Sequence, residues 1–259
     1  MHFDPVLLSH GDVSAEVVPE RGTLVSSLKV GGKAVLSLDR STLEDLSKNV
    51  RGGIPVLFPY AGKLNDGKFL PAGTEMKQHG FGRNKKWTVT SLGVSHVRTQ
   101  LLPDAETRAV YPYEFSADQT VLILPSGLQI ELLIHNLDSK PLPVSPGWHP
   151  YFNCAAAQKA SVNGSVDAFN LAPHTDAAEF DFGAVAPADG RAHFTIPQLG
   201  TLKLSFSPEM RHMQFWSQPG KDFICIEPFT GPNNTVNTDK RIDIPPGAAH
   251  LFFMRIEIE

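Results

Sequence analysis

The stretch TVLILPSGLQIELLIHN, residues 120–136, decides the fold class of this chain. Two apolar runs flank the triplet PSG at 125–127, whose residue types are typical of tight turns. The second run alternates with the two-residue period of a strand that is buried on one face. Its apolar positions are Leu128, Ile130, Leu132 and Ile134. The stretch therefore predicts an antiparallel β-hairpin.

The same alternation recurs in TLKLSFS at 201–207 and in FFMRIEIE at 252–259. Helical periodicity is scarce, and its best candidate is STLEDLSKNV at 41–50. There we expect Ser41 to cap a short helix and Glu44 to complete a capping box. Residues 155–198 are rich in Ala, Asp, Pro and Gly and are expected to contain mostly loops. The chain is therefore predicted to be all-β, an antiparallel sandwich or barrel with few short helices.

The composition favours a single domain that covers residues 1–259. Hydrophobic residues make up 41% of the chain, which is enough for a large core, and no internal repeat, low-complexity tract or linker is evident. The 23 basic and 27 acidic residues leave a formal charge of −4. Because nucleic acids and anionic membranes attract proteins with a basic excess, we expect neither as a partner. The sequence does not indicate an oligomeric state.

The two cysteines, Cys154 and Cys225, form neither a disulfide framework nor a CxxC metal motif. We interpret them as reduced thiols of a cytoplasmic protein. The chain starts without the features of a signal peptide, and no apolar run approaches the length that spans a bilayer. G-x-S-x-G and HExxH are absent, and the GFG at 80–82 lacks the third glycine of a dinucleotide-binding turn. We therefore expect no metal and no cofactor.

Four segments combine polar or charged residues with aromatic surroundings, and we expect them to form one site. They are RGGIPVLFP (51–59), HGFGR (79–83), PGWHPYFN (146–153) and CIEPF (225–229). In DFICIEPF, alternation places Cys225 and Glu227 on the same face, and Pro228 is expected to end the strand. A carboxylate that projects from an apolar strand needs a partner, so Glu227 is either catalytic or part of a structural ion pair with a residue such as Arg51.

Other residues of these segments also have a structural interpretation. His79 and His149 are each compatible with a hydrogen-bonded histidine in a turn. Arg83, together with Lys85 and Lys86, is compatible with a solvated basic turn. The aromatic residues can pack in the core instead of lining a ligand site. These residues are Phe58, Tyr60, Phe81, Trp148, Tyr151 and Phe229.

From about Arg51 to the C-terminus, the four segments and their order resemble the aldose 1-epimerases, or galactose mutarotases, and their hexose-6-phosphate relatives. The resemblance implies a large antiparallel β-sandwich, the galactose mutarotase-like supersandwich, with the sugar in an open groove on one sheet. It also implies an isomerase that interconverts the α and β anomers of an aldose. The expected partner is accordingly a small molecule, an aldose or a sugar phosphate.

The resemblance also implies roles for individual residues. Glu227 matches the catalytic base and His149 the catalytic acid, whereas His79 and Arg51 match positions that bind the sugar. Arg83 is a further candidate for substrate binding. The family also uses an aspartate in the middle of the chain to hold sugar hydroxyls. The candidates for it are Asp167, Asp176 and Asp181.

This chemistry suits the residue types, because opening a hemiacetal ring needs a base at the anomeric hydroxyl and an acid at the ring oxygen. With ordinary pKa values, a carboxylate and an imidazolium can coexist near neutral pH. One alternative is a sugar-binding protein without activity, which would not need a matched acid and base. Another is a glycoside-processing enzyme, which would need a second acid near Glu227 that no local sequence indicates.

The substrate subgroup has mixed signals. RGGIPVLFP and HGFGRN resemble the hexose-6-phosphate mutarotases, whereas GWHPYFN resembles the branch that acts on free aldoses. Five cations occur close together in the sequence and could hold a phosphate, namely Arg51, Lys63, Arg83, Lys85 and Lys86. The formal charge of −4 provides no general attraction for anions, so the sequence favours a neutral aldose.

Overall fold

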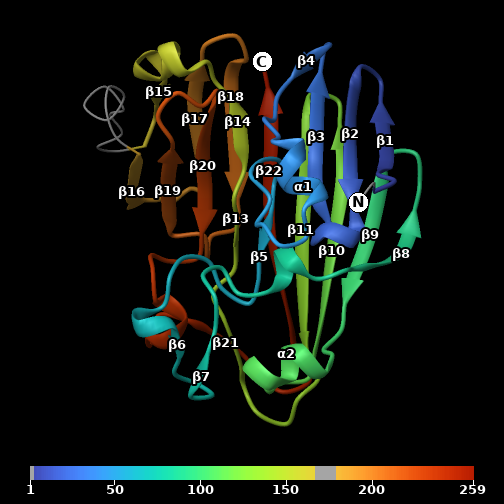
Figure 1. The fold of residues 1–259 in the computed structure, drawn as a ribbon, viewed down its shortest axis with the longest axis vertical. Helices are drawn as coiled ribbons and strands as arrows, with labels where there is room; N and C mark the ends of the chain where they lie inside the picture. Colours follow the sequence, from blue (N-terminus) through green and yellow to red (C-terminus); the bar gives the residue numbers. More distant parts are fainter. Residues whose placement is uncertain (1–2, 167–178) are drawn as a thin grey trace.

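The computed structural model describes residues 3–166 and 179–259, and its strands form antiparallel sheets (Figure 1). The largest sheet has eight strands, and it runs through the middle of the molecule. In spatial order its strands are β15 (Asn163–Gly164), β17 (Arg191–Ile196), β18 (Gly200–Phe206), β22 (Ala249–Ile258), β11 (Gly127–Asn136), β10 (Phe115–Leu124), β9 (His96–Leu101) and β8 (Thr88–Leu92).

Two further sheets and two small ribbons contain the remaining described strands. The four-stranded sheet has the order β1 (Val6–His10), β2 (Val13–Val18), β3 (Leu24–Val30) and β4 (Lys33–Ala34). The six-stranded sheet has the order β16 (Phe180–Val185), β19 (His212–Ser217), β20 (Phe223–Phe229), β13 (Gly147–Trp148) and β5 (Val56–Leu57), with β14 (Tyr151–Asn153) also paired to β20. The ribbons pair β12 (Leu142–Val144) with β21 (Ile242–Ile244), and β6 (Lys68–Phe69) with β7 (Thr74–Glu75).

The four-stranded and six-stranded sheets both pack on the eight-stranded sheet. Strands β1 and β2 contact β10, and β1–β4 overlie the green strands β10 and β11 in Figure 1. Towards the β15 end of the same buried face, the rings of Phe194 in β17 and Phe215 in β19 lie 5.9 Å apart. Isolated bridges, including Val25 to Ile54, connect the two smaller sheets through the segment at 52–54. The architecture is therefore a sandwich and not a barrel.

The expected hairpin is confirmed, and it lies at the centre of the large sheet. Strands β10 and β11 pair with Leu124 opposite Gly127, so the turn consists of Pro125 and Ser126. The alternating apolar residues of β11 are fully buried, as are most of those in TLKLSFS and FFMRIEIE, which form β18 and β22. Burial of one face of each strand against the opposite layer supplies the hydrophobic stabilisation of the sandwich.

The helices are short, and the expectation for 41–50 was wrong in its boundaries. Helix α1 (Arg40–Glu44) begins two residues earlier than expected, because the Asp39 side chain accepts the Ser41 N–H at 3.0 Å and is the N-cap in place of Ser41. The other described helices are α2 (Ala105–Val110) and the 3₁₀ turns η1 (Pro19–Arg21), η2 (Asn65–Gly67), η3 (Gly82–Asn84), η4 (Ala156–Ser161) and η6 (Thr235–Asn237). Within residues 3–166 and 179–259, no helix is long and apolar enough to cross a membrane.

Two other expectations about the chain are corrected by the structure. The described part of 155–198 is not mostly loop, because it contains β15, β16 and β17 as well as η4. Strand β20 does not end at Pro228 but continues to Phe229, with Pro228 opposite Met213. A proline fits into an antiparallel ladder at a position where its missing N–H is not required.

Gly80 makes the turn of HGFGR possible, and we expect its replacement to destabilise the protein strongly. Gly80 has a φ of +66°, and a Cβ there would lie 2.3 Å from the carbonyl oxygen of Phe58. Gly67 has a nearly identical φ of +67° but open space around it. Gly67→Ala should therefore cost about 1 kcal/mol of the free energy of unfolding, and Gly80→Ala about 1–3 kcal/mol more. Urea unfolding of both variants measures the difference, and equal losses would contradict the steric argument.

Candidate active site

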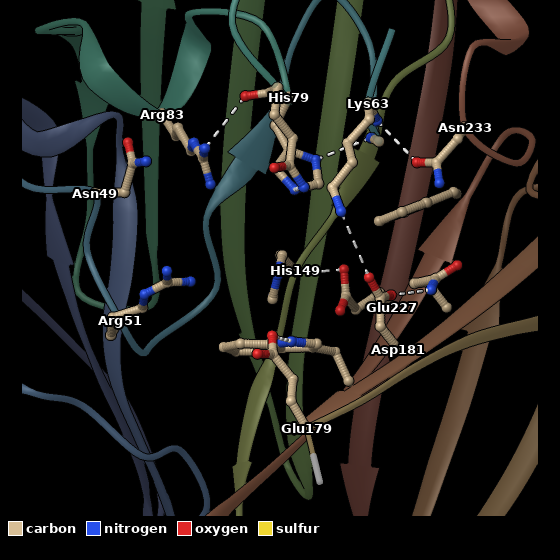
Figure 2. Close-up of a pocket in the computed structure, with 15 residues that line it drawn as sticks. Asn49, Arg51, Lys63, His79, Arg83, His149, Glu179, Asp181, Glu227 and Asn233 are labelled. Atoms are coloured by element: carbon tan, nitrogen blue, oxygen red, sulfur yellow. Dashed lines mark hydrogen bonds and ion pairs between the residues drawn. The ribbon is translucent and has the colours of Figure 1, made fainter. Parts of the chain in front are cut away.

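One pocket of about 710 Å³, its open mouth included, contains residues of all four segments singled out in the sequence. It lies where β16, β19 and β20 meet the loops around residues 49–51, 62–63 and 78–83. Figure 2 shows the side chains converging on it from these separate elements. The lining residues are Asn49, Arg51, Gly62, Lys63, Gln78, His79, Arg83, His149, Glu179, Asp181, Gln214, Trp216, Glu227, Phe229 and Asn233.

His149 and Glu227 form the centre of the pocket. The Nε2 atom of His149 lies 3.4 Å from Oε2 of Glu227, and the two residues are 7% and 1% exposed. Strand β20 pairs with β13 at Phe229 and with β14 at Cys225, and these two registers place His149 directly opposite Glu227. The pair is thus positioned by β13 and β14, which both pair with β20. His149 and Pro150 form the connection between these two strands.

The burial of this pair changes its protonation. Burial and the negative charge of Asp181 raise the pKa of the Glu227 carboxyl well above its usual range. Burial and the positive charges of Arg83 and Arg51 lower the pKa of His149 to about 3. Both shifts favour the neutral forms, so the pair holds one exchangeable proton between carboxyl and imidazole. This differs from the separate anion and cation expected from the ordinary pKa values of exposed groups.

His79 lies beside the pair, and its contacts determine which ring nitrogen carries the proton. Its Nδ1 accepts the Gly62 N–H at 2.9 Å, and burial lowers its pKa well below the usual range. The neutral ring therefore carries its proton on Nε2, which lies 3.0 Å from the side-chain amide of Gln78 and can donate to that amide only when the amide presents its oxygen. The backbone of His79 has a φ of 67°, which is uncommon for a residue with a side chain. His79 is thus a fixed hydrogen-bond donor at the pocket wall.

Two arginines line the same wall without a carboxylate partner among the described residues. Arg83 donates a hydrogen bond to the Gln78 carbonyl at 3.2 Å, and its Nε has no partner in the described structure. Burial lowers the pKa of Arg83 to about 10, which leaves the guanidinium charged at neutral pH. Arg51 lies over the Trp216 ring, with its Cζ 5.2 Å from the ring centroid. Glu227 therefore contacts His149, and the alternative ion pair with Arg51 is not formed.

The other three cations of the sequence cluster separate in space. Lys63 lines the pocket, where its Nζ lies 3.8 Å from Oδ2 of Asp181. Lys85 points elsewhere and pairs with Asp104 and Glu106, at 2.9 and 2.5 Å. Lys86 is exposed. Neither of the last two is among the residues that line the pocket.

Of the three candidate aspartates, Asp181 lines the pocket, whereas Asp167 and Asp176 lie outside the described residues. Asp181 accepts a hydrogen bond from Nε2 of Gln214 at 2.5 Å, and Gln214 lies opposite Glu227 in the sheet. The sequence analysis missed Gln214. Alternation within HMQFWS at 212–217 could have indicated it, because every second residue of that strand faces Glu227's side of the sheet.

The aromatic residues divide between the core and the site. Phe58, Tyr60, Phe81 and Trp148 belong to the main hydrophobic core. Phe229 lines the pocket, as does Trp216, which the sequence analysis did not single out. The Tyr151 ring stacks on His149, with centroids 4.8 Å apart and planes at 14°. Tyr151 therefore fixes the orientation of the imidazole.

A set of metal-ligand atoms also lies at the base of the pocket. Among the described residues, His149, Cys225 and Glu227 each offer one such atom, and these atoms lie within 4.8 Å of one another. All three residues are buried, and both cysteines of the chain are free thiols. The sequence shows no metal-binding spacing, because Cys225 and Glu227 come from β20 and His149 from the connection between β13 and β14.

Comparison with known proteins identifies relatives of both the sequence and the fold. An E. coli K12 protein named "Putative glucose-6-phosphate 1-epimerase" is 28% identical over 172 residues, 64% of this chain and 54% of that protein. Protein LacX (plasmid) of Lactococcus lactis is 27% identical over 137 residues, 48% of this chain and 46% of that protein. The chain thus matches about half the length of these curated relatives.

Two solved structures share the fold, which confirms the expected galactose mutarotase-like sandwich. The Slr1438 protein of Synechocystis is 28% identical with a TM-score of 0.91, over 100% of this chain and 96% of that one. A galactose mutarotase-like protein of Lactobacillus casei is 21% identical with a TM-score of 0.79, over 99% and 100% of the two chains. The sequence model of the aldose 1-epimerases matches residues 4–247. The chain therefore belongs to the aldose 1-epimerase family.

Proposed function

We propose that the protein is an aldose 1-epimerase that interconverts the α and β anomers of a hexose by opening and reclosing the sugar ring. The observation that carries this proposal is the buried His149–Glu227 pair at 3.4 Å, which lies in an open pocket lined by residues of all four segments. Membership of the family supports the same reaction class. A pocket that only binds sugar would have no use for an acid and a base in direct contact.

The shared proton of the pair suits both ends of the reaction. When this proton is on His149, Glu227 is a carboxylate and accepts the proton of the anomeric hydroxyl. His149 gives its proton to the ring oxygen, the bond from C1 to that oxygen breaks, and C1 becomes a carbonyl. The pair is then neutral, which is the form that burial favours. After rotation about the C1–C2 bond, the reverse transfers close the ring on the other carbonyl face.

The surrounding residues would hold the sugar while the ring opens. His79 can donate from Nε2, Arg51 and Arg83 can donate from their guanidinium groups, and Asp181 can accept from hydroxyl groups. The Trp216 ring offers an apolar surface to the C–H face of a pyranose. Because all of these side chains line the same pocket, one sugar could contact them together.

The direct test is anomer equilibration, and we expect the purified protein to accelerate it. Freshly dissolved α-glucose and α-galactose are followed by polarimetry, and the exchange between anomers at equilibrium by NMR. Glucose 6-phosphate is included, with buffer as the control. If none of the three sugars equilibrates faster than in buffer while one of them binds, the protein is a sugar-binding protein and the proposed reaction is wrong.

A hexose 6-phosphate is a second candidate substrate, and the two arginines favour it. Arg51 and Arg83 line the pocket as cations without a carboxylate partner among the described residues. Lys63, in contrast, forms an ion pair with Asp181. A phosphate with a charge near −2 would find charge-assisted hydrogen bonds there. The net charge of the whole molecule, which favoured a neutral aldose, does not describe this local surplus.

If glucose 6-phosphate is the substrate, we expect Arg83→Ala to lower kcat/KM for it by about 10- to 150-fold. This factor corresponds to a loss of about 1.5–3 kcal/mol of transition-state stabilisation, the contribution of a charged hydrogen bond. The preference for the phosphorylated sugar should also weaken at high salt. Lys86→Ala removes an exposed cation of the same sequence cluster outside the pocket and is the matched control. Equal or better use of free glucose, with Arg83→Ala close to wild type, would instead support the neutral aldose.

We further propose that residues 1–259 act as one domain in the cytoplasm, with a small-molecule sugar as partner. The two buried, free thiols support a reducing compartment. The slight acidic excess supports the absence of nucleic-acid and membrane partners.

A further inference from the structure

We propose that the base of the pocket is also a binding site for one thiophilic divalent cation, such as zinc or cadmium, held by His149, Cys225 and Glu227. Glu227 and His149 line the pocket, whereas Cys225, two residues before Glu227 in β20, is fully buried and does not line it. A cation that enters through the pocket would therefore meet the carboxylate and the imidazole first, and then the sulfur.

The spacing of these groups suits tetrahedral coordination. Bond lengths of about 2.0–2.2 Å to nitrogen and oxygen separate two tetrahedral ligands by about 3.3 Å. The observed distance from Nε2 of His149 to Oε2 of Glu227 is 3.4 Å. A thiolate ligand lies about 3.6 Å from its neighbours in such a site, and all three ligand atoms here lie within 4.8 Å of one another. A sulfur shift of about 1 Å would complete the set.

Apart from the two atoms in contact at 3.4 Å, each polar residue of this cluster has a further atom without a partner among the described residues. Oε1 of Glu227 and Nδ1 of His149 are buried and have no hydrogen-bond partner in the described structure. Cys225 is a free thiol packed with Tyr151, Trp216 and Phe223. Buried polar atoms without partners are rare in native structures and are often explained by an ion or ligand.

The chemistry of the three ligands determines which cations fit. A thiolate, an imidazole and a carboxylate form a typical zinc ligand set, whereas magnesium and calcium prefer oxygen ligands alone. The thiolate and the carboxylate together balance a charge of +2. They also offset the repulsion from Arg51 and Arg83, whose side chains line the same pocket.

Binding would have a consequence for activity, and this part rests on the proposed function. The cation would occupy the carboxylate and the imidazole that exchange protons with the sugar, so it would inhibit competitively. The site would thus act as an inhibitory metal site, and a chelator would restore turnover.

The experiment is a titration of the untagged protein with Cd²⁺, followed by calorimetry and by the ultraviolet charge-transfer band of a cadmium thiolate. We expect one Cd²⁺ per chain and a thiolate band. Cys225→Ser should abolish the band and weaken binding about 100-fold, and Cys225→Ala serves as a second variant if the serine disturbs folding. Cys154→Ser removes the other buried thiol and should leave both readouts unchanged. Glu227→Gln should weaken binding at least about 10-fold while the thiol remains.

Three outcomes would overturn the proposal: no band in the folded wild-type protein, a band that persists in both Cys225 variants, or Cd²⁺ affinity that is unchanged by Glu227→Gln. The last of these would indicate a thiol that binds without the other two ligands. Mg²⁺ is the control cation and should produce no heat of binding at this site. If Cd²⁺ binds as expected but metal-free protein does not accelerate anomer equilibration, the metal site stands and the proposed function fails.

Discussion

Glu227→Gln is expected to lower kcat for anomer interconversion by about 10² or more while the affinity for sugar stays close to wild type. The amide has the size of the carboxylate and can still form a hydrogen bond to His149, but it cannot accept the proton of the anomeric hydroxyl. In the described part of the chain, buried Glu227 pairs with His149 and its Oε1 has no hydrogen-bond partner, so little of the surrounding structure depends on its charge. NMR exchange measures kcat, and calorimetry measures sugar affinity.

The chain provides a matched control for this substitution. Glu209 and His250 form a second pair, with Oε1 and Nε2 3.3 Å apart, but both side chains are 31% exposed and neither lines the pocket. Glu209→Gln makes the same chemical change at a pair of the same type and should leave turnover unchanged. Wild-type turnover in Glu227→Gln, or an equal loss in Glu209→Gln, would show that Glu227 is not the base.

His149→Asn is expected to lower kcat by a similar factor, about 10² or more, because among the described residues His149 is the group in contact with Glu227 that can return a proton to the ring oxygen. Among the described residues, the imidazole Nδ1 has no hydrogen-bond partner and the ring stacks on Tyr151, so its removal breaks no hydrogen bond of that nitrogen. The variant should therefore fold and bind sugar. His250→Asn is the control.

The double variant sharpens this prediction. If His149 and Glu227 exchange protons with the sugar as one unit, Glu227→Gln combined with His149→Asn should be little slower than either single variant. Losses that multiply would indicate that the two residues act independently. If His149→Asn alone keeps its turnover, then His79, whose ring centroid lies 5.6 Å from that of His149, becomes the candidate acid.

The strands could be predicted from the sequence because their signal is local. Leu128 and Ile130 alternate with polar residues whatever lies opposite them, and both are fully buried in β11. Predictions from residue type alone were wrong where contacts with other residues set the end of a strand or the start of a helix. Pro228 stays within β20 because its position opposite Met213 needs no N–H. Helix α1 begins directly after Asp39 because that side chain accepts the Ser41 N–H.

The residues of the site were largely predictable as well. His79, Arg51 and Arg83 were singled out together with His149 and Glu227, and all five line one pocket. Their roles in catalysis and binding stay predictions, but their convergence is observed. What the motifs could not indicate was Gln214, whose strand carries no recognisable motif, or the choice of Asp181 among the three aspartates.

The strand pattern, the fold class and the segments that meet in the pocket could be predicted from the amino-acid sequence, because alternation and motif spacing are properties of the chain. The protonation and the local charge of the site depend on how these segments pack. Opposing registers along β20 bring His149 against Glu227 and Tyr151 against Cys225, and burial then moves the pKa of both members of the His149–Glu227 pair towards the neutral forms. The same packing leaves Arg51 and Arg83 without carboxylate partners in the described pocket, whereas Lys85 is paired elsewhere. Protonation and local charge depend on solvent exclusion and on distances between segments far apart in sequence, which no local pattern encodes.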